Sequence, residues 1–313
     1  MAAKLPPVDQ SYSVVSQLAS FSEVQNYLAA ETLKALGIQS AGWWYRLTRL
    51  ALSLPLGRLA RLAMEFDRRV AAEGFQEAAR WVLPHFIRRI VAEGVENVPT
   101  QGPVLIASNH PGTFDSLAII ASLPRRDIGV VLAANPFFRV FQHARQHFIY
   151  STLDPYARMA VLRSAVRHLQ AGGALVIFAT GKLDPDPAYY LEEAQRSIER
   201  WSSSLAFMLR KVPETRLVPV AAGNFVAQSC LRSPLAHLRR APADRQRLAE
   251  FLQVIQQLIL GWRFSNVPRL LFGPPLTLAP QPDGTGDDMQ PIRQAALQLL
   301  TRLPASLAPQ SYP

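Results

Sequence analysis

The spacing of apolar and polar residues changes near residue 90. Before that point apolar residues recur three and four positions apart, which is the period of amphipathic helices, and strand patterns are rare. A first helix is predicted to end at Gly37, and longer helices are predicted over 43–64 and 66–91. Pro55 and Pro84 are expected to kink or break these two helices. The first part of the chain is therefore predicted to be all-helical.

After residue 90, short apolar runs alternate with helical patterns, as is typical of α/β proteins in which helices connect parallel strands. We predict strands at 90–95, 104–107, 128–133, 148–150, 174–179, 217–220 and 269–272. Helices are predicted at 115–123, 156–170, 191–212, 244–262 and 291–303. The predicted organisation is an N-terminal helical region (1–89), a layered α/β domain with a largely parallel sheet (90–303) and a frayed tail (304–313).

Composition narrows the class of protein and of partner. Hydrophobic residues make up 49% of the 313 residues and charged residues 18%, which excludes a disordered chain. A single cysteine, Cys230, excludes an internal disulfide. The formal net charge is +10, and all but four of the 33 basic residues are arginines. Such basicity favours phosphate-bearing partners, either nucleic acid or anionic lipid, and no nucleic-acid-binding motif accompanies it.

The segment 43–64 is the strongest candidate for contact with a membrane. It opens with Trp43, Trp44 and Tyr45, but arginines and Pro55 interrupt the leucines that follow. No run of about 18 apolar residues occurs anywhere, so no transmembrane helix is predicted. One interpretation is a helix lying in the membrane interface, and the other is a core-packed helix whose arginines reach solvent. Both stay open, because leucines and arginines do not separate onto two faces.

The clearest chemistry follows the predicted strand 104–107. His110 and Asp115 are five positions apart across a Pro-Gly turn that begins with Asn109. Binding and catalytic groups gather at the carboxyl ends of strands in α/β sheets. The Asp115 carboxylate can reach one imidazole nitrogen, which would fix the tautomer and leave the other nitrogen as a general base. The alternative is that Asp115 only caps the next helix and that His110 is an ordinary turn residue.

Motifs in order along the chain resemble those of the glycerolipid acyltransferase superfamily, which includes lysophosphatidate and glycerol-3-phosphate acyltransferases. The resemblance covers about residues 90–275, and its motifs are Asn109-His110-x4-Asp115, Phe148-Ile149, Phe178–Gly181 and Val218–Val220. It implies that His110 deprotonates an acceptor hydroxyl, which attacks the thioester of acyl-CoA or acyl-carrier protein, and that Asp115 orients His110. It implies no cofactor beyond that donor. The residues expected to bind substrate are Asn109, Gly112, Thr113, Phe178, Thr180, Gly181 and Lys182.

Two departures from the family pattern change the expected acceptor. The third motif of the family approximates Phe-Pro-Glu-Gly-Thr-Arg, but here Thr180 replaces the glutamate and Leu183 the arginine, with Lys182 one place early. The second motif usually ends in Asp-Arg, whereas Tyr150-Ser151 follow here. Both arginines that could grip a phosphate with two donors are therefore missing. A glycerol-phosphate acceptor is disfavoured, and an acceptor without phosphate is favoured.

The sequence thus predicts an acyltransferase that is peripheral on the cytoplasmic side of the membrane. It would move a fatty acyl group from acyl-CoA or acyl-carrier protein to a hydroxyl or amine of a lipid acceptor related to phospholipids or glycerolipids. An anionic membrane surface is the expected partner, and nucleic acid is not. A second class stays open, a catalytically silent lipid-binding protein of the same fold. No metal site is predicted, because His143 and His147 have no evident third ligand.

Overall fold

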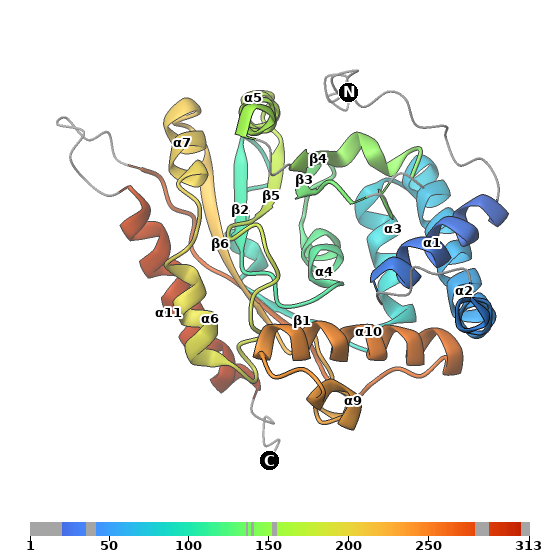
Figure 1. Cartoon of the computed structure of the whole chain (residues 1–313). Coiled ribbons are helices and arrows are strands. Elements are labelled where there is room, and N and C mark those ends of the chain that lie inside the picture. Colours follow the sequence, from blue (N-terminus) through green and yellow to red (C-terminus); the bar gives the residue numbers. More distant parts are fainter. Residues whose placement is uncertain are drawn as a thin grey trace, which may run out of the picture.

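The computed structural model describes residues 21–35, 42–135, 137–138, 141–151, 155–278 and 288–307. Within them a central sheet carries helices on both faces (Figure 1). The strands are β1 (Val91–Glu93), β2 (Val104–Ser108), β3 (Ile128–Ala133), β4 (Phe148–Ser151), β5 (Ala174–Phe178), β6 (Arg216–Gly223) and β7 (Arg269–Phe272). Their order is β1-β7-β6-β2-β5-β3-β4, and every neighbouring pair is parallel except β6 and β7. The predicted α/β fold with a largely parallel sheet is confirmed.

Helices precede, connect and follow the strands. Before the sheet come α1 (Phe21–Ala35), α2 (Trp43–Glu73) and α3 (Phe75–Val82). The others are α4 (Asp115–Ser122), α5 (Pro155–Gln170), α6 (Leu191–Ile198), α7 (Ser204–Lys211), α8 (Gln228–Leu231), α9 (Pro234–His237), α10 (Pro242–Leu260) and α11 (Met289–Leu307). None of the described helices has the length and sustained apolar character needed to cross a bilayer.

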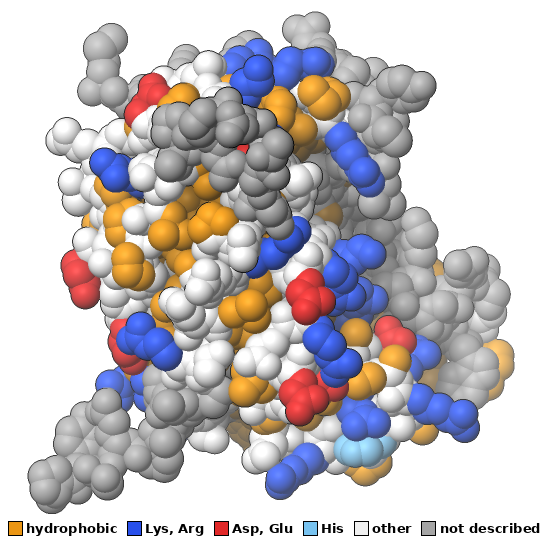
Figure 2. Space-filling view, turned by 90° about the vertical axis from the view of Figure 1, so that its left-hand side faces the viewer, with side chains coloured by type: hydrophobic (Ala, Val, Ile, Leu, Met, Phe, Trp, Pro, Cys, Tyr) orange, Lys and Arg blue, Asp and Glu red, His pale blue; other side chains and the backbone are white. Residues whose placement is uncertain are grey.

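The central strand β2 shows how the two faces are covered. All five of its residues are buried, and successive side chains point to opposite faces of the sheet. Val104 and Ile106 pack into a core with α1, α2, α3 and α4, whereas Leu105 and Ala107 pack with α5, α6, α7 and α11. The outer surface on the side of α6, α7 and α11 carries acidic and basic side chains interspersed with apolar ones (Figure 2). Burial on both faces explains why β2 is a continuous apolar run.

The two long helices predicted before residue 90 differ from the observed ones. α2 continues through Pro55 to Glu73 and ends at Gly74, which has a φ of 98°. Pro55 removes only one backbone N–H from the helix, and the burial of Leu56 beside it stabilises the helix against the core. The break expected at Pro84 is confirmed, because a 3₁₀ turn replaces α3 there. The described part of the N-terminal region is helical as predicted, but its long helix ends at a glycine and not at Pro55.

Other boundaries also differ. The helix predicted over 191–212 is divided into α6 and α7, because the Ser202 N–H donates to the Ala179 carbonyl oxygen at 2.9 Å and Trp201 is buried. The short helices α8 and α9 were not predicted. α11 continues to Leu307, so the first residues of the expected frayed tail are helical. The predicted helix end at Gly37 and the rest of the tail lie outside the described residues.

Candidate active site

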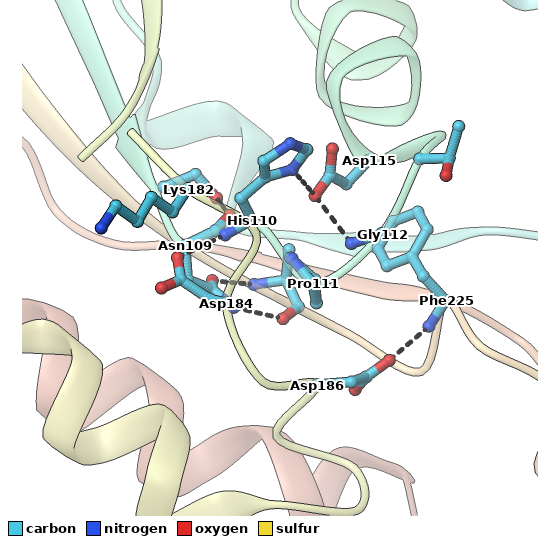
Figure 3. A network of polar contacts seen from close by, with 12 residues as sticks. Asn109, His110, Pro111, Gly112, Asp115, Lys182, Asp184, Asp186 and Phe225 are labelled. Atoms are coloured by element: carbon cyan, nitrogen blue, oxygen red, sulfur yellow. Dashed lines mark hydrogen bonds and ion pairs between the residues drawn. The ribbon is translucent and has the colours of Figure 1, made fainter. Parts of the chain in front are cut away.

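The turn after β2 places His110 and Asp115 together at the carboxyl edge of the sheet (Figure 3). His110 Nδ1 lies 2.7 Å from Asp115 Oδ2, and the Gly112 N–H donates to the same oxygen at 3.2 Å. Asp115 is fully buried, whereas 28% of the His110 side chain is exposed. A Cβ on Gly112 would lie 2.6 Å from Phe225 Cβ, so this close approach requires glycine. The carboxylate is thus enclosed and the imidazole accessible.

The contact with Asp115 determines the protonation pattern of His110. A carboxylate only accepts, so Nδ1 carries a proton, and Nε2 is the basic nitrogen of the neutral ring. Nε2 has no hydrogen-bond partner within the described part of the chain. Burial lowers the pKa of His110, but the charge and hydrogen bond of Asp115, helped by the charge of Asp184, outweigh it and raise that pKa above its ordinary value. His110 is therefore an oriented and strengthened base.

The segment after β5, which contains the third motif, packs against the same histidine. The rings of Phe178 and His110 are stacked, with centroids 4.2 Å apart. The Asp184 N–H donates to the His110 carbonyl oxygen at 2.7 Å, and Asp184 Oδ2 accepts from the His110 N–H at 2.9 Å. Thr180 Oγ1 also donates to Asp184 Oδ2, at 3.0 Å. Burial raises the pKa of Asp184, although these hydrogen bonds counteract the rise. Asp184 therefore fixes the backbone of the base, a role that sequence analysis missed.

Other predicted binding residues lie around the turn in different ways. Both amide atoms of Asn109 are bonded to the backbone of Ala222 at 2.8 Å, and its side chain is fully buried. Asn109 therefore ties β2 to β6 through both of its amide atoms, and its expected contact with substrate stays a prediction. Gly181 lies in the third-motif turn with a φ of 67°. Lys182 is exposed and extends away from the imidazole of His110 (Figure 3).

A buried polar stripe on α10 supports the site. Gln246, Glu250, Gln253 and Gln257 are spaced three and four residues apart, so they share one face of the helix, and all four are buried. Each is hydrogen-bonded to a segment outside α10. α10 lies across the end of the sheet where β2 and β6 finish (Figure 1). The side chains of the stripe therefore form hydrogen bonds with backbone groups that would otherwise bond to solvent.

Two residues of the stripe contact the segments that hold His110. Gln246 Nε2 donates to the carbonyl oxygens of Pro111 at 2.8 Å and of Asp184 at 3.0 Å. Glu250 Oε2 accepts from Thr113 Oγ1 at 2.9 Å. Burial raises the pKa of Glu250 to about 8, against the effect of the Thr113 hydrogen bond. Glu250 is therefore mostly protonated at neutral pH, and Thr113 faces a carboxyl group of the protein.

A second buried carboxyl group organises the end of β6. Asp186 accepts from the backbone N–H of Asn224 at 2.8 Å. It also accepts from the N–H of Phe225 at 2.8 Å (Figure 3). Its own N–H donates to Gln246 Oε1 at 2.9 Å. Burial raises the pKa of Asp186 to about 6, against the effect of those N–H groups. Asp186 thus holds Phe225 in its place against Gly112 of the turn.

Glu250 makes stability depend on pH. Its pKa is 4.5 in an ordinary environment and about 8 here, so between these values the folded protein keeps a proton that the unfolded chain releases. This contribution to the free energy of unfolding is full below the lower value and is lost as pH rises to the upper one. Glu250→Gln should therefore gain about 4–5 kcal/mol relative to wild type across that window. Urea unfolding of wild type and variant near pH 4.5 and near pH 8 measures this difference in the free energy of unfolding. As a control, Glu214→Gln changes an exposed residue, and the difference between this variant and wild type should not grow over the same pH range.

His147, one of the two histidines considered for metal binding, is engaged by the residues around it. The His147 ring stacks on Phe75 with centroids 4.5 Å apart, and its Nδ1 lies 2.8 Å from the Ile128 carbonyl oxygen. Burial lowers the pKa of His147. No cluster of three metal-ligating side chains occurs within the described ranges. His147 therefore contributes to packing between α3 and the sheet.

The geometry of the turn can be compared with known proteins. Residues 89–223 match the model of the Acyltransferase family. These residues form an acyltransferase domain. The match runs from just before β1 to the end of β6, so it contains His110, Asp115 and the third motif. The resemblance to the glycerolipid acyltransferase superfamily is thereby confirmed.

Other comparisons are sparser. No curated protein sequence matches the chain. Among solved structures, the chain is similar to the 1-acyl-sn-glycerophosphate (LPA) acyltransferase PlsC from Thermotoga maritima, with a TM-score of 0.43 and 14% sequence identity. That similarity covers 93% of this chain and 98% of the other. The family match, by contrast, indicates that the present protein is an acyltransferase, an enzyme that acts on an acyl donor and a lipid acceptor.

Proposed function

We propose that this acyltransferase moves a fatty acyl group from acyl-CoA or acyl-carrier protein to a hydroxyl or amine of a lipid, with His110 as general base. The observation that carries the proposal is the 2.7 Å contact between His110 Nδ1 and Asp115 Oδ2. It leaves Nε2 without a partner among the described residues, on a side chain that is 28% exposed, so Nε2 is the atom available to an acceptor hydroxyl. The intact pair disfavours the catalytically silent alternative.

The proposed reaction needs two proton transfers at one nitrogen. His110 Nε2 takes the proton of the acceptor hydroxyl while the hydroxyl oxygen bonds to the carbonyl carbon of the thioester. The buried Asp115 carboxylate stabilises the imidazolium that results, because their charges are opposite and 2.7 Å apart. When the carbon–sulfur bond breaks, Nε2 returns the proton to the departing thiolate. Asp184 and Gln246 act as positioning residues, because they hold the backbone of the turn.

The acceptor is proposed to be uncharged or to carry an amine. The carboxyl groups of Asp115, Asp184 and Asp186 surround the turn, and none of them is ion-paired with an arginine or lysine in the described residues. Such surroundings disfavour a phosphate monoester, which carries up to two negative charges. Lys182 does not offset them, since it extends away from the imidazole. The lost arginines of the family motifs and the acidic surroundings therefore favour the same acceptor class.

The enzyme is proposed to act as a peripheral protein on a membrane surface. Trp43, Leu47, Leu50 and Leu54 of α2 are spaced four, three and four residues apart, which places them on one face of the helix. Between 50% and 71% of each of these side chains is exposed. We call this set the α2 stripe. An exposed apolar stripe with an aromatic residue at its end suits a helix lying in the membrane interface and disfavours the core-packed interpretation.

A labelled acyl donor tests the function directly. The purified enzyme is incubated with labelled acyl-CoA or acyl-carrier protein and a total membrane lipid extract, and the products are separated. The proposal predicts that label moves into a lipid. Label found only in free fatty acid would assign a hydrolase instead, and no release from either donor would leave the silent lipid-binding protein as the better account.

A further inference from the structure

A cavity of about 500 Å³ lies where α2 meets the C-terminal end of α10. Its volume is in the range of small-molecule sites. α2 contributes Arg58 and Arg61, the 3₁₀ turn after α3 contributes His85 and Phe86, and Gln257 and Arg263 come from the end of α10 and the residues beyond it. The Phe86 ring stacks on Phe114, with centroids 4.2 Å apart, and no residue of the turn 109–115 lines the cavity. This cavity is therefore distinct from the catalytic site.

The cavity is lined by arginines that no acidic side chain neutralises. Arg58, Arg61 and Arg263 form no ion pair within the described residues. Arg58 Nη1 donates to the carbonyl oxygens of Leu258 and Ile259 at 2.5 and 2.6 Å, which caps the end of α10. Arg61 and Arg263 are exposed and donate no hydrogen bond to the described residues, although Arg61 Cζ lies over the Phe21 ring, 5.7 Å from its centroid. Positive charge here is therefore available to an anion.

One buried polar atom of the cavity lacks a partner. Gln257 is 4% exposed, and its Nε2 donates to the Phe86 carbonyl oxygen at 2.6 Å. Its Oε1 accepts no hydrogen bond from any described residue. Leaving a buried acceptor without a donor is unfavourable, so the cavity suits a ligand that brings an O–H or N–H group beside its negative charge. A phosphate flanked by a hydroxyl has both features.

The surroundings of the cavity are apolar and exposed. Arg58 and Arg61 follow Leu54 at spacings of four and three residues, so the arginines continue the face of the α2 stripe. On the other side, 49% of Leu260 and 61% of Trp262 are exposed. The combination of arginines with an exposed tryptophan and leucines is typical of surfaces that contact the headgroup region of a bilayer. On the face of the molecule formed by α6, α7 and α11, acidic side chains are interspersed with the basic and apolar ones (Figure 2).

We propose that this cavity binds the phosphate headgroup of an anionic phospholipid within a bilayer. Arg61 and Arg263 contact the phosphate, a headgroup hydroxyl donates to Gln257 Oε1, and Trp262 lies in the interface beside them. The proposal rests on the proposed membrane docking, since it adds a headgroup site to the α2 stripe. It gives the protein a preference for anionic membranes that does not depend on the acceptor bound near His110.

Vesicle sedimentation of the full chain tests the headgroup site. Wild type is expected to bind phosphatidylglycerol vesicles more tightly than phosphatidylcholine vesicles. The double variant Arg61→Gln with Arg263→Gln should bind phosphatidylglycerol about thirtyfold more weakly, because each cation near an anionic surface contributes roughly fivefold, and should bind phosphatidylcholine as wild type does. The matched control removes two exposed arginines, Arg239→Gln with Arg240→Gln, at the other end of α10, about 28 Å away. The control should bind both vesicles almost as wild type does.

The outcomes separate the headgroup site from the proposed membrane docking. Trp43→Ser with Leu47→Ser should weaken binding to both kinds of vesicle, and Leu235→Ser with Leu238→Ser, two exposed leucines elsewhere, should not. If wild type binds no vesicle, membrane docking and the headgroup site both fail. If the α2 variant loses binding but the Arg61 and Arg263 variant binds phosphatidylglycerol normally, only the headgroup site is overturned. An equal loss in the Arg239 and Arg240 control would also overturn it, because general surface charge would then suffice.

Discussion

His110→Ala should lower kcat for acyl transfer by about 10²–10⁴ without unfolding the enzyme, since loss of a general base commonly costs that much. The expected loss is large because the buried Asp115 cannot replace Nε2, and the other carboxyl groups at the turn are engaged by backbone or side-chain donors. KM for the acyl donor should change little, since the imidazole acts mainly in the transition state. Initial rates at saturating donor, with circular dichroism of each variant, measure the effect.

Two variants make the interpretation of that loss specific. His110→Gln offers an amide that can still donate to Asp115 but has no basic nitrogen, so it should lose as much activity as His110→Ala. His237→Ala removes an exposed histidine from α9 and should keep the rate of wild type. A folded His110→Gln enzyme that retained normal turnover would show that the acceptor needs no base at this position.

Lysophosphatidate and glycerol 3-phosphate should be poor acceptors beside an uncharged or amino-bearing hydroxyl lipid. One two-donor contact between arginine and phosphate contributes roughly 1.5–3 kcal/mol, so the absence of two should lower kcat/KM for these acceptors by at least about 10². The carboxyl groups around the turn act in the same direction. A competition assay with one acyl-CoA and a mixed panel of acceptors gives the ratio of specificity constants.

A substitution that restores an arginine of the family motif tests the reason for this acceptor preference. Leu183 occupies the arginine position of the third motif, so Leu183→Arg should raise kcat/KM for lysophosphatidate, and Leu183→Met, which adds no charge, should not. If lysophosphatidate were the best acceptor of the wild-type enzyme, other cations would have compensated for the missing arginines, and the proposed acceptor class would be wrong.

Local sequence patterns predicted the sheet well and two helix boundaries poorly. The strands at Ile128–Ala133 and Arg269–Phe272 have the predicted bounds, because each is a short apolar run between turn-forming residues. Pro55 is inside a helix because tertiary packing outweighs one lost hydrogen bond. The loop at 199–203 exists because Ser202 bonds to Ala179, and no local pattern encodes a partner that distant.

The candidate site shows the same difference between features encoded by neighbouring residues and features that depend on residues distant in sequence. His110 and Asp115 could be found because they are close in sequence and follow a buried strand. Gln246 and Glu250 were missed because polar residues at helical spacing normally face solvent, and here they face the turn. Gln246 bonds to Pro111 across 135 positions of sequence. The regular spacing of the stripe was visible, but only the fold shows which side of α10 is covered.

The pH dependence of kcat/KM in wild type and in Asp115→Asn tests the central claim, that Asp115 orients and strengthens His110 as the base. In wild type the rate should fall as pH drops through a His110 pKa that lies above its ordinary value of 6.5. Asparagine removes the charge that raises this pKa, so the acid limb should move to lower pH while the maximal rate falls sharply, because an amide can favour the wrong tautomer. An acid limb at an unchanged pH, with most of the activity retained, would contradict the account and leave Asp115 as a helix cap.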